Sequence, residues 1–298
     1  MPKHTPETKS NQAPHQPVLG EAVLDMLTPQ PGERYLDLTA GYGGHTRPIL
    51  ERTGYQPDHV LVDRDQEAVS YLTRQFADDA VRLIHSDYEA ALAGFHPEDV
   101  FDLICLDLGV SSPQLDSAER GFSFSADGPL DMRMDQTRGI TAAELLDRLS
   151  EADIADILAR YGEERQSGRI ARAIARARPI ERTTQLSEIV AGAYTGKSRL
   201  HPATRTFQAL RIAVNDEIGQ LERSLPMIES VLSSGGRMAV ISFHSLEDRT
   251  VKQFITGSSL EPLNRGVIQG KTNDVSNPRA RSAKLRAAIK NTNGPAGA

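Results

Sequence analysis

The sequence predicts an α/β fold, in which helices cover both faces of a parallel sheet and an all-helical domain is inserted. Three observations predict it. Apolar runs alternate with helical patterns over residues 18–107, residues 115–205 show helical spacing without a convincing strand, and an apolar run returns at 237–243. Strands that alternate with helices at this spacing form parallel sheets buried on both faces.

The first part of the chain supplies most of the predicted sheet. Apolar runs predict strands at 34–38, 59–63, 81–85 and 101–107, and helical spacing predicts helices at 18–27 and 66–76. The carboxyl ends of parallel strands meet at one edge, where such sheets bind ligands. Residues that follow these strands are therefore the candidates for a binding site.

The middle of the chain is predicted to be helical. Helical spacing covers 141–149, 151–160, 165–178 and 185–194. Ser150 followed by Asp153, and Thr184 followed by Ser187 and Glu188, are predicted helix starts.

One long helix is predicted from Phe207 to Leu232, because its apolar residues recur every three or four positions. Pro226 should kink this helix, and Gly235-Gly236 should end it. The remaining prediction is a strand at 237–243, a helix at 245–254, a loose loop at 257–278 and a last strand at 282–289.

These elements divide the chain into a discontinuous core and an insert. Residues 15–114 and 206–290 form the core, and residues 115–205 form the inserted helical domain. Residues 1–14 and 291–298 are polar, aperiodic and rich in Pro, Gly or Asn, so we expect two mobile tails.

Composition excludes several classes of protein. No run approaches the roughly 18 apolar residues of a membrane helix, and the first residues lack the apolar core of a signal peptide, so we expect a cytoplasmic protein without a membrane partner. The only cysteine, Cys105, excludes an internal disulfide and a zinc site of several thiolates. A net charge of −6 argues against non-specific coating of nucleic acid.

Three segments are nevertheless locally basic. Arg165, Arg169, Arg172 and Arg176 form one stripe of a predicted helix, residues 197–211 contain no acid, and residues 271–290 carry six bases against Asp274. A solvated helix face explains the stripe as well as RNA contact does. With no Trp, phosphate contacts around one extruded base are favoured over broad stacking.

A glycine-rich loop follows the first strand. It reads Asp37-Leu-Thr-Ala-Gly41-Tyr-Gly43-Gly44-His45. Such a loop lets the backbone approach a ligand, although alone it can be only a turn. Asp63 ends the second strand, where an acid accepts hydrogen bonds from ribose, and Asp87-Tyr88 follow the third, where they can read and cover an adenine. Together these residues predict an adenosine-containing cofactor.

The loop also selects among such cofactors. A dinucleotide fingerprint needs a third glycine where this chain has Thr46, and no P-loop string is present. The loop instead resembles that of Rossmann-like S-adenosylmethionine enzymes. In that class the fourth strand end, here Asp107, faces the transferable methyl group. A carboxylate there can hold the N–H bonds of a base amine as its nitrogen becomes tetrahedral, and the alternative is that Asp107 caps the following turn.

Longer strings identify a family. They are HQPVL from His15, GYGGH from Gly41, DLGVSSPQLD from Asp107, ERGFSFSADGPLDMRMD from Glu119, HPATRTFQALRIAVN from His201, FHSLEDRTVK from Phe243 and NPRARSAKLR from Asn277. In this order, over about residues 13–290, the chain resembles the bacterial 16S ribosomal RNA N4-cytosine methyltransferases, the RsmH (also called MraW) family.

The resemblance implies a Rossmann-like class I S-adenosyl-L-methionine-dependent methyltransferase whose inserted helical domain recognises the substrate. The implied substrate is the exocyclic N4 amine of a decoding-region cytidine in 16S rRNA within the small ribosomal subunit, with no DNA substrate. Asp107 is the implied catalytic residue. The implied cofactor contacts are Gly43, Gly44, His45, Asp63, Tyr88, Asp107 and Gln114, and Asp87 is the alternative to Tyr88 at the adenine.

Several candidate residues also have structural explanations. Cys105 lies in an apolar strand without a basic neighbour, so core packing is favoured over the thiolate route of C5-cytosine enzymes. His244 can act on substrate, but Ser245 to Asp248 can equally be a capping box. Asp127, Asp131 and Asp135 are spaced like metal ligands, yet methyl transfer from a sulfonium needs no metal and we expect none.

The sequence is also compatible with two rival functions. A DNA amino-methyltransferase is disfavoured because the string after Asp107 lacks the Pro-Pro-aromatic sequence of such enzymes. A non-catalytic ribosome-assembly factor is disfavoured because carboxylates stand at all four strand ends.

Overall fold

The structure is a computed structural model that describes residues 16–196 and 201–291. The predicted tails therefore lie outside the described residues, apart from Asn291, and so do residues 197–200 of one basic segment. Within the described ranges, no helix combines the length and apolar character needed to cross a bilayer.

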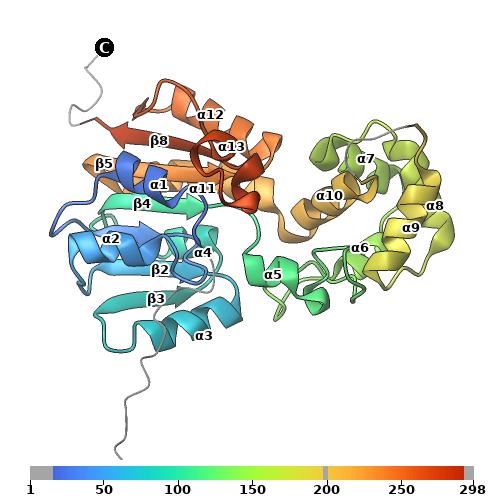
Figure 1. Cartoon of the computed structure of the whole chain (residues 1–298), viewed down its shortest axis with the longest axis horizontal. Helices are drawn as coiled ribbons and strands as arrows, with labels where there is room; N and C mark the ends of the chain where they lie inside the picture. The colour runs from blue at the N-terminus through green and yellow to red at the C-terminus, as the bar shows by residue number, and fades with distance from the viewer. Residues whose placement is uncertain (1–15, 197–200, 292–298) are drawn as a thin grey trace, which may run out of the picture.

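A single sheet organises the larger part of the molecule (Figure 1). Its strands run in the order β3-β2-β1-β4-β5-β8-β6, and β7 also pairs with β8. Strands β1 to β5 are parallel, whereas β8 runs antiparallel to β5. The strands are β1 (Tyr35–Asp37), β2 (His59–Asp63), β3 (Val81–His85), β4 (Phe101–Asp107), β5 (Leu232–Ser242), β6 (Leu260–Pro262), β7 (Ile268–Gln269) and β8 (Lys284–Lys290).

Helices cover both faces of this sheet, as the sequence predicts. One face packs on α1 (Gly20–Leu27), α2 (Thr46–Thr53) and α3 (Gln66–Gln75), and the other on α4 (Tyr88–Ala93), α11 (Glu217–Val231) and α12 (Ser245–Gly257). Strand β4 shows why: Leu103 and Cys105 point to the first face, and Ile104 and Leu106 to the second. A strand buried on both faces needs apolar residues at consecutive positions, here Leu103 to Leu106.

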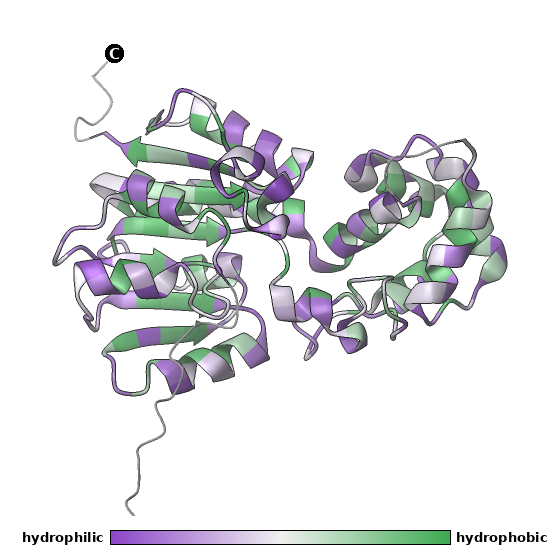
Figure 2. Ribbon diagram, viewed as in Figure 1, coloured by the Kyte–Doolittle hydropathy of each residue, from purple (hydrophilic) through white to green (hydrophobic). Residues whose placement is uncertain are grey.

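A helical unit lies beside the sheet, at the right of Figure 1. It contains α6 (Ala142–Arg148), α7 (Glu151–Gly162), α8 (Ser167–Ala177), α9 (Thr183–Ala193) and α10 (Ala203–Asn215), joined to the core through α5 (Ser112–Asp116) and the turn η1 (Ala118–Arg120). Its apolar side chains form a separate core that includes Leu158, Ile174 and Leu210, and Figure 2 shows hydrophobic residues in green along its helices. Helix α10, which spans the predicted domain boundary at 205/206, contributes to this second core.

The long helix predicted at 207–232 is wrong, because the chain breaks it at Asp216. Asp216 has a left-handed backbone (φ 49°) and separates α10 from α11, whereas Pro226 lies inside α11 without ending it. The apolar stripe is continuous in sequence but serves two cores: Leu210 packs in the helical unit, and Leu225 packs against the sheet. Periodicity reports that a helix has a buried face and does not report which neighbour buries it.

The end of the chain also differs from prediction. Gly235-Gly236 lie inside β5 and end no helix, and the predicted loose loop contains β6, β7 and the short helix α13 (Gly270–Asn273). These short elements pair with β8 and carry little periodicity of their own. The predicted strand at 282–289 is confirmed as β8.

One of the two predicted helix starts is confirmed, and the other differs from the prediction. Ser150 and Asp153 form a capping box on α7, as expected. Helix α9 instead begins at Thr183, and the hydroxyl of Thr184 donates to Asp127 (2.6 Å). A hydroxyl can satisfy a distant carboxylate as well as a helix end, and sequence alone does not separate the two roles.

Candidate active site

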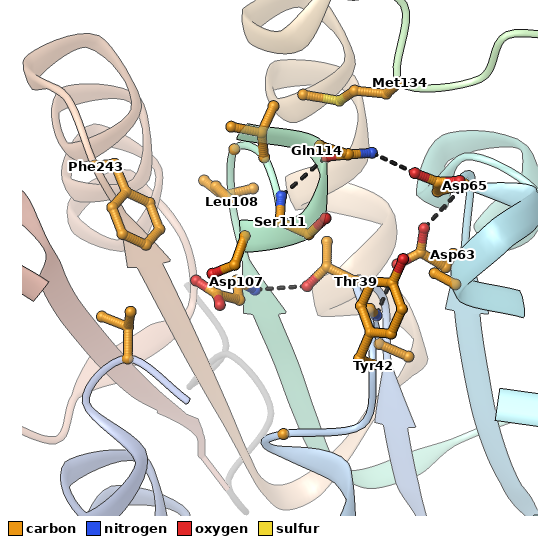
Figure 3. A pocket seen from close by; sticks show the side chains of 18 of the residues that line it. Thr39, Tyr42, Asp63, Asp65, Asp107, Leu108, Ser111, Gln114, Met134 and Phe243 are labelled. Carbon is orange, nitrogen blue, oxygen red and sulfur yellow. Dashed lines mark hydrogen bonds between the residues drawn. The ribbon is translucent and has the colours of Figure 1, made fainter. Parts of the chain in front are cut away.

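A cavity of about 1050 Å³ opens at the carboxyl ends of β1, β2 and β4. Its walls come from the glycine loop, the segment after β4, the start of α11 and the segment 278–282. Figure 3 shows Asp63, Asp107 and Gln114 around this space. Parallel strands bring these residues together, because each follows a strand that ends at the same edge.

Asp63 forms the floor of one side of the cavity. Its Oδ2 accepts the backbone N–H of Gly41 (2.7 Å), and its Oδ1 accepts that of Asp65 (2.8 Å; Figure 3). Burial raises the pKa of Asp63 to about 6, although these two hydrogen bonds oppose the rise. Each oxygen retains a lone pair, so Asp63 can still accept hydrogen bonds from a ligand.

The glycine loop contributes unequally to the cavity. Gly44 and His45 line it, whereas Gly43 does not and instead lies against the core. A methyl group placed on Gly43 would lie 3.4 Å from Leu72 and 3.6 Å from Phe76. With φ at 78°, Gly43 shapes the loop because other residues rarely adopt that conformation.

His45 and Asp107 form a pair beside the reacting end of the cavity. His45 Nε2 lies 3.6 Å from Asp107 Oδ2, and the backbone N–H of Asp107 donates to Thr39 Oγ1 (2.6 Å). Burial opposes a charge on His45, but Asp107 and Asp37 raise its pKa above the usual value. Among the described residues, neither His45 Nε2 nor Asp107 Oδ1 has a hydrogen-bond partner. Both atoms are buried, whereas the Asp107 side chain as a whole is 28% exposed and lines the cavity.

Tyr88 and Asp87 stand where the adenine was expected. Tyr88 lines the cavity, but its ring is mostly buried in the core and the Arg64 guanidinium lies 5.6 Å from its centre. Asp87 caps α4 by accepting from Ala90 (2.8 Å) and pairs with Arg138 (3.1 Å). Both side chains reach the cavity, so geometry does not choose between them.

Gln114 lines the cavity, but neighbouring residues engage both ends of its amide. Its Nε2 donates to Asp65 Oδ2 (2.7 Å), and its Oε1 accepts the N–H of Ser111 (2.9 Å; Figure 3). Arg120 donates to the same Asp65 oxygen (2.8 Å) and to the carbonyl of Met134 (2.8 Å). Sequence reasoning missed Asp65 and Arg120; the only available signal was that Arg120 falls within one of the family strings.

The sequence profile of the MraW methylase family matches residues 12–291. The chain belongs to the MraW methylase family. Relatives named ribosomal RNA small subunit methyltransferase H include those of Stenotrophomonas maltophilia (45% identical, covering 96% of each chain) and Nostoc punctiforme (47%, covering 93% and 94%). Among solved structures, an rRNA methylase from Streptococcus thermophilus has 9% identity and a TM-score of 0.44, covering 91% of this chain and 93% of its own.

In this MraW methylase, Cys105 is buried in β4. Burial, followed by the charges of Asp37 and Asp107, raises the pKa of its thiol well above the usual value. A thiol in such surroundings is a poor source of thiolate. Cys105 therefore packs in the core of the fold.

A second charged cluster lies next to the cavity; the sequence pointed to its histidine, His244, but not to its two glutamates. Glu217, His244 and Glu247 place ligand atoms within 4.8 Å of one another. Arg211 already donates to both oxygens of Glu217 (2.8 Å each). His244 Nδ1 accepts the N–H of Glu247 (3.4 Å), which leaves the proton on Nε2, 3.0 Å from Glu247 Oε1. The chemistry of this cluster is that of an ion-paired network rather than a metal site.

The capping box of α12 lies one residue earlier than predicted. The capping box of α12 joins His244 and Glu247, one residue before the predicted Ser245 to Asp248. Asp248 instead pairs with Lys284 (2.8 Å) and Arg286 (2.7 Å) of β8.

The three acidic residues spaced by four do not converge. Each has an arginine partner of its own: Asp127 with Arg182 (2.5 Å), Asp131 with Arg133 (2.7 Å) and Asp135 with Arg138 (2.6 Å).

Proposed function

We propose that this protein transfers a methyl group from S-adenosylmethionine to the exocyclic N4 amine of a decoding-region cytidine in 16S rRNA, within the small ribosomal subunit. Family membership and the names of the relatives support methylation of ribosomal RNA. The observation that carries the choice of an amine is Asp107, whose carboxylate side chain lines the cavity and is 28% exposed. An amine that becomes tetrahedral needs such an acceptor.

The residues around the cavity fit the cofactor. The volume of about 1050 Å³ exceeds what one nucleoside needs and leaves room for a base. Asp63 can accept both ribose hydroxyls, Asp87 or Tyr88 can meet the adenine, and Gly44 with His45 can hold the methionine end. When bound, S-adenosylmethionine supplies an electrophilic methyl group on a sulfonium. This chemistry needs no metal.

The chain's own residues then have distinct tasks. Thr39 fixes the backbone at Asp107, and the His45 side chain holds the Asp107 carboxylate from one side. The Asp107 carboxylate can accept an N–H of the base amine, which directs the nitrogen lone pair toward the cofactor. Because this contact strengthens as the nitrogen becomes tetrahedral, Asp107 should act mainly on kcat.

We also propose that the helical unit positions the RNA. Arg165, Arg169 and Arg176 are exposed on or next to α8, and Arg281 is exposed at the cavity rim. Phosphate contacts of this kind orient a nucleic acid without reading its sequence.

The test measures methyl incorporation into small-subunit particles, naked 16S rRNA, a short cytidine oligomer and duplex DNA, and identifies the modified base by mass. We expect N4-methylcytidine, formed preferentially in the ribosomal substrates. Asp107→Ala should lower kcat by about 10²- to 10³-fold, with Cys105→Ser as the matched control. A methyl group on carbon 5, or a preference for DNA, would overturn the proposal.

A further inference from the structure

Arg211 is not among the predicted site residues, but it lines the cavity near Gly109, two residues after Asp107. It lies in the last turn of α10, yet its side chain lines the cavity at the edge of the sheet. It therefore connects the helical unit to the reacting end of the core.

Two carboxylates fix its orientation. Nε and Nη2 donate to the two oxygens of Glu217 (2.8 Å each), and Nη2 lies 3.8 Å from Glu247. Glu247 is held in turn by the backbone N–H of Phe243 (2.8 Å). Burial opposes the charge, but Glu217 and Glu247 raise the pKa of Arg211 above its usual value. The guanidinium thus stays charged, and its planar geometry fixes the direction of the remaining nitrogen.

The remaining nitrogen, Nη1, lies beside Gly109, and both residues line the cavity. A methyl group placed on Gly109 would lie 3.7 Å from Nη1 and 3.6 Å from the Phe243 ring. Gly109 has φ at 92°, so this position both requires glycine and keeps the space open. Within the described residues, Nη1 makes no hydrogen bond to protein. This donor is left for a ligand that offers an acceptor.

The surroundings indicate what kind of ligand this is. Gly109 lies two residues after Asp107, and Figure 3 shows Phe243 beside Asp107 and Leu108. Asp107 offers an acceptor, Arg211 offers a donor, and Phe243 offers an aromatic face. A flat ring with an amine next to a ring acceptor matches this set, and cytosine presents N4 next to N3.

We propose that Arg211 Nη1 donates to N3 of the target cytosine and so turns N4 toward Asp107, an assignment that rests on the proposed function. Arg211 is then a residue that determines specificity. Uracil is rejected because its N3 carries a hydrogen that would face the guanidinium, in addition to lacking the amine. The helical unit takes part in base recognition through this side chain.

The experiment compares two RNA substrates, one with cytidine and one with 3-deazacytidine at the target, which replaces N3 by C–H. The quantity measured is the ratio of their kcat/KM values. Because the intrinsic effect of the replacement is common to all enzymes tested, differences in this ratio report the contact to N3.

The main variant is Arg211→Met combined with Glu217→Gln, which avoids leaving a buried carboxylate unpaired. We expect its ratio to be lower than that of the wild type by about 10- to 100-fold, the usual value of a hydrogen bond from a charged donor. Arg211→Lys keeps a charge for Glu217 but lacks Nη1, so it should lower the ratio as well. Calorimetric affinity for S-adenosylmethionine should be unchanged in both.

The matched control is Arg237→Met combined with Glu33→Gln. In this pair one nitrogen, Arg237 Nη2, donates to both oxygens of Glu33 (2.8 and 2.7 Å), and neither residue lines the cavity, so the double variant should keep the wild-type ratio. If the wild type and the Arg211 variants gave equal ratios while N4 methylation was intact, the assignment of Arg211 would be refuted and the proposed function would stand. Absence of N4 methylation by the wild type would overturn the proposed function and this assignment with it.

Discussion

Arg120→Met should destabilise the protein more than removal of an exposed, ion-paired arginine does. Arg120 and Asp65 are each only 6% exposed, and Arg120 also donates to the carbonyls of Met134 (2.8 Å) and Arg133 (3.2 Å). Methionine fills similar volume but leaves Asp65 as a buried charge without its cation. Breaking one side of such a pair costs about 3–5 kcal/mol. At about 2–4 °C per kcal/mol, the Tm should fall by about 6–20 °C.

The assay is thermal unfolding followed by circular dichroism, together with calorimetric titration of S-adenosylmethionine. Cofactor affinity should also fall, because Asp65 holds Gln114 at the cavity wall and its N–H donates to Asp63. Arg160→Met is the matched control: its partner is Asp156, both side chains are more than half exposed, and such pairs contribute about 0–1 kcal/mol.

A second variant separates charge from packing. In Asp65→Asn combined with Arg120→Met, both charges are gone, so part of the lost stability should return. A Tm for Arg120→Met within a degree or so of the wild type would refute the reasoning, as would a double variant less stable than the sum of its single variants.

Three further predictions concern the site. The pKa of Asp63 is raised to about 6, so its carboxylate is lost as pH falls through that value: cofactor affinity should drop about tenfold between about pH 7.5 and about pH 5, and Asp63→Asn should flatten this dependence in calorimetric titrations. In the protein without cofactor, the raised pKa of Asp63 means that the folded state binds this proton more tightly than the unfolded state does. The proton therefore stabilises the fold below the ordinary pKa of an aspartate, and this contribution is lost as pH rises through about 6. Cys105→Ser should retain methylation within about tenfold, because only packing changes; loss of all transfer in a folded, cofactor-binding variant would restore the thiolate mechanism. Arg169→Glu and Arg281→Glu should each reduce the log–log salt slope of RNA binding by roughly 0.7–0.9 without changing cofactor affinity; an unchanged slope would remove that arginine from the RNA path.

Much of the sheet could be predicted because its signals are local. A strand buried on both faces is an apolar run, as in β2 and β4, and these two strands and the edge strand β3 begin and end at the predicted residues. The carboxylates Asp63 and Asp107 could be placed at one edge for the same reason, since parallel strands share the direction of their carboxyl ends.

Other features depend on neighbours that are distant in sequence. The stripe from Phe207 to Leu232 is uniform, but the fold divides it between two cores and breaks it at Asp216. Strands β6 and β7 form by pairing with β8, and each is only two or three residues long, too short to show an alternating pattern in the sequence.

The sequence by itself determined the α/β class, the helical character of the insert and the acidic residues at the strand ends, because each follows from local periodicity and from the direction of parallel strands. Only the tertiary structure decided that Arg120 and Gln114 meet at Asp65, and that Glu217 and Glu247 orient Arg211 toward the cavity. The physical reason is that a polar side chain of a given type can satisfy many partners equally well. Which partner it meets is set by how the helical unit and the sheet pack together.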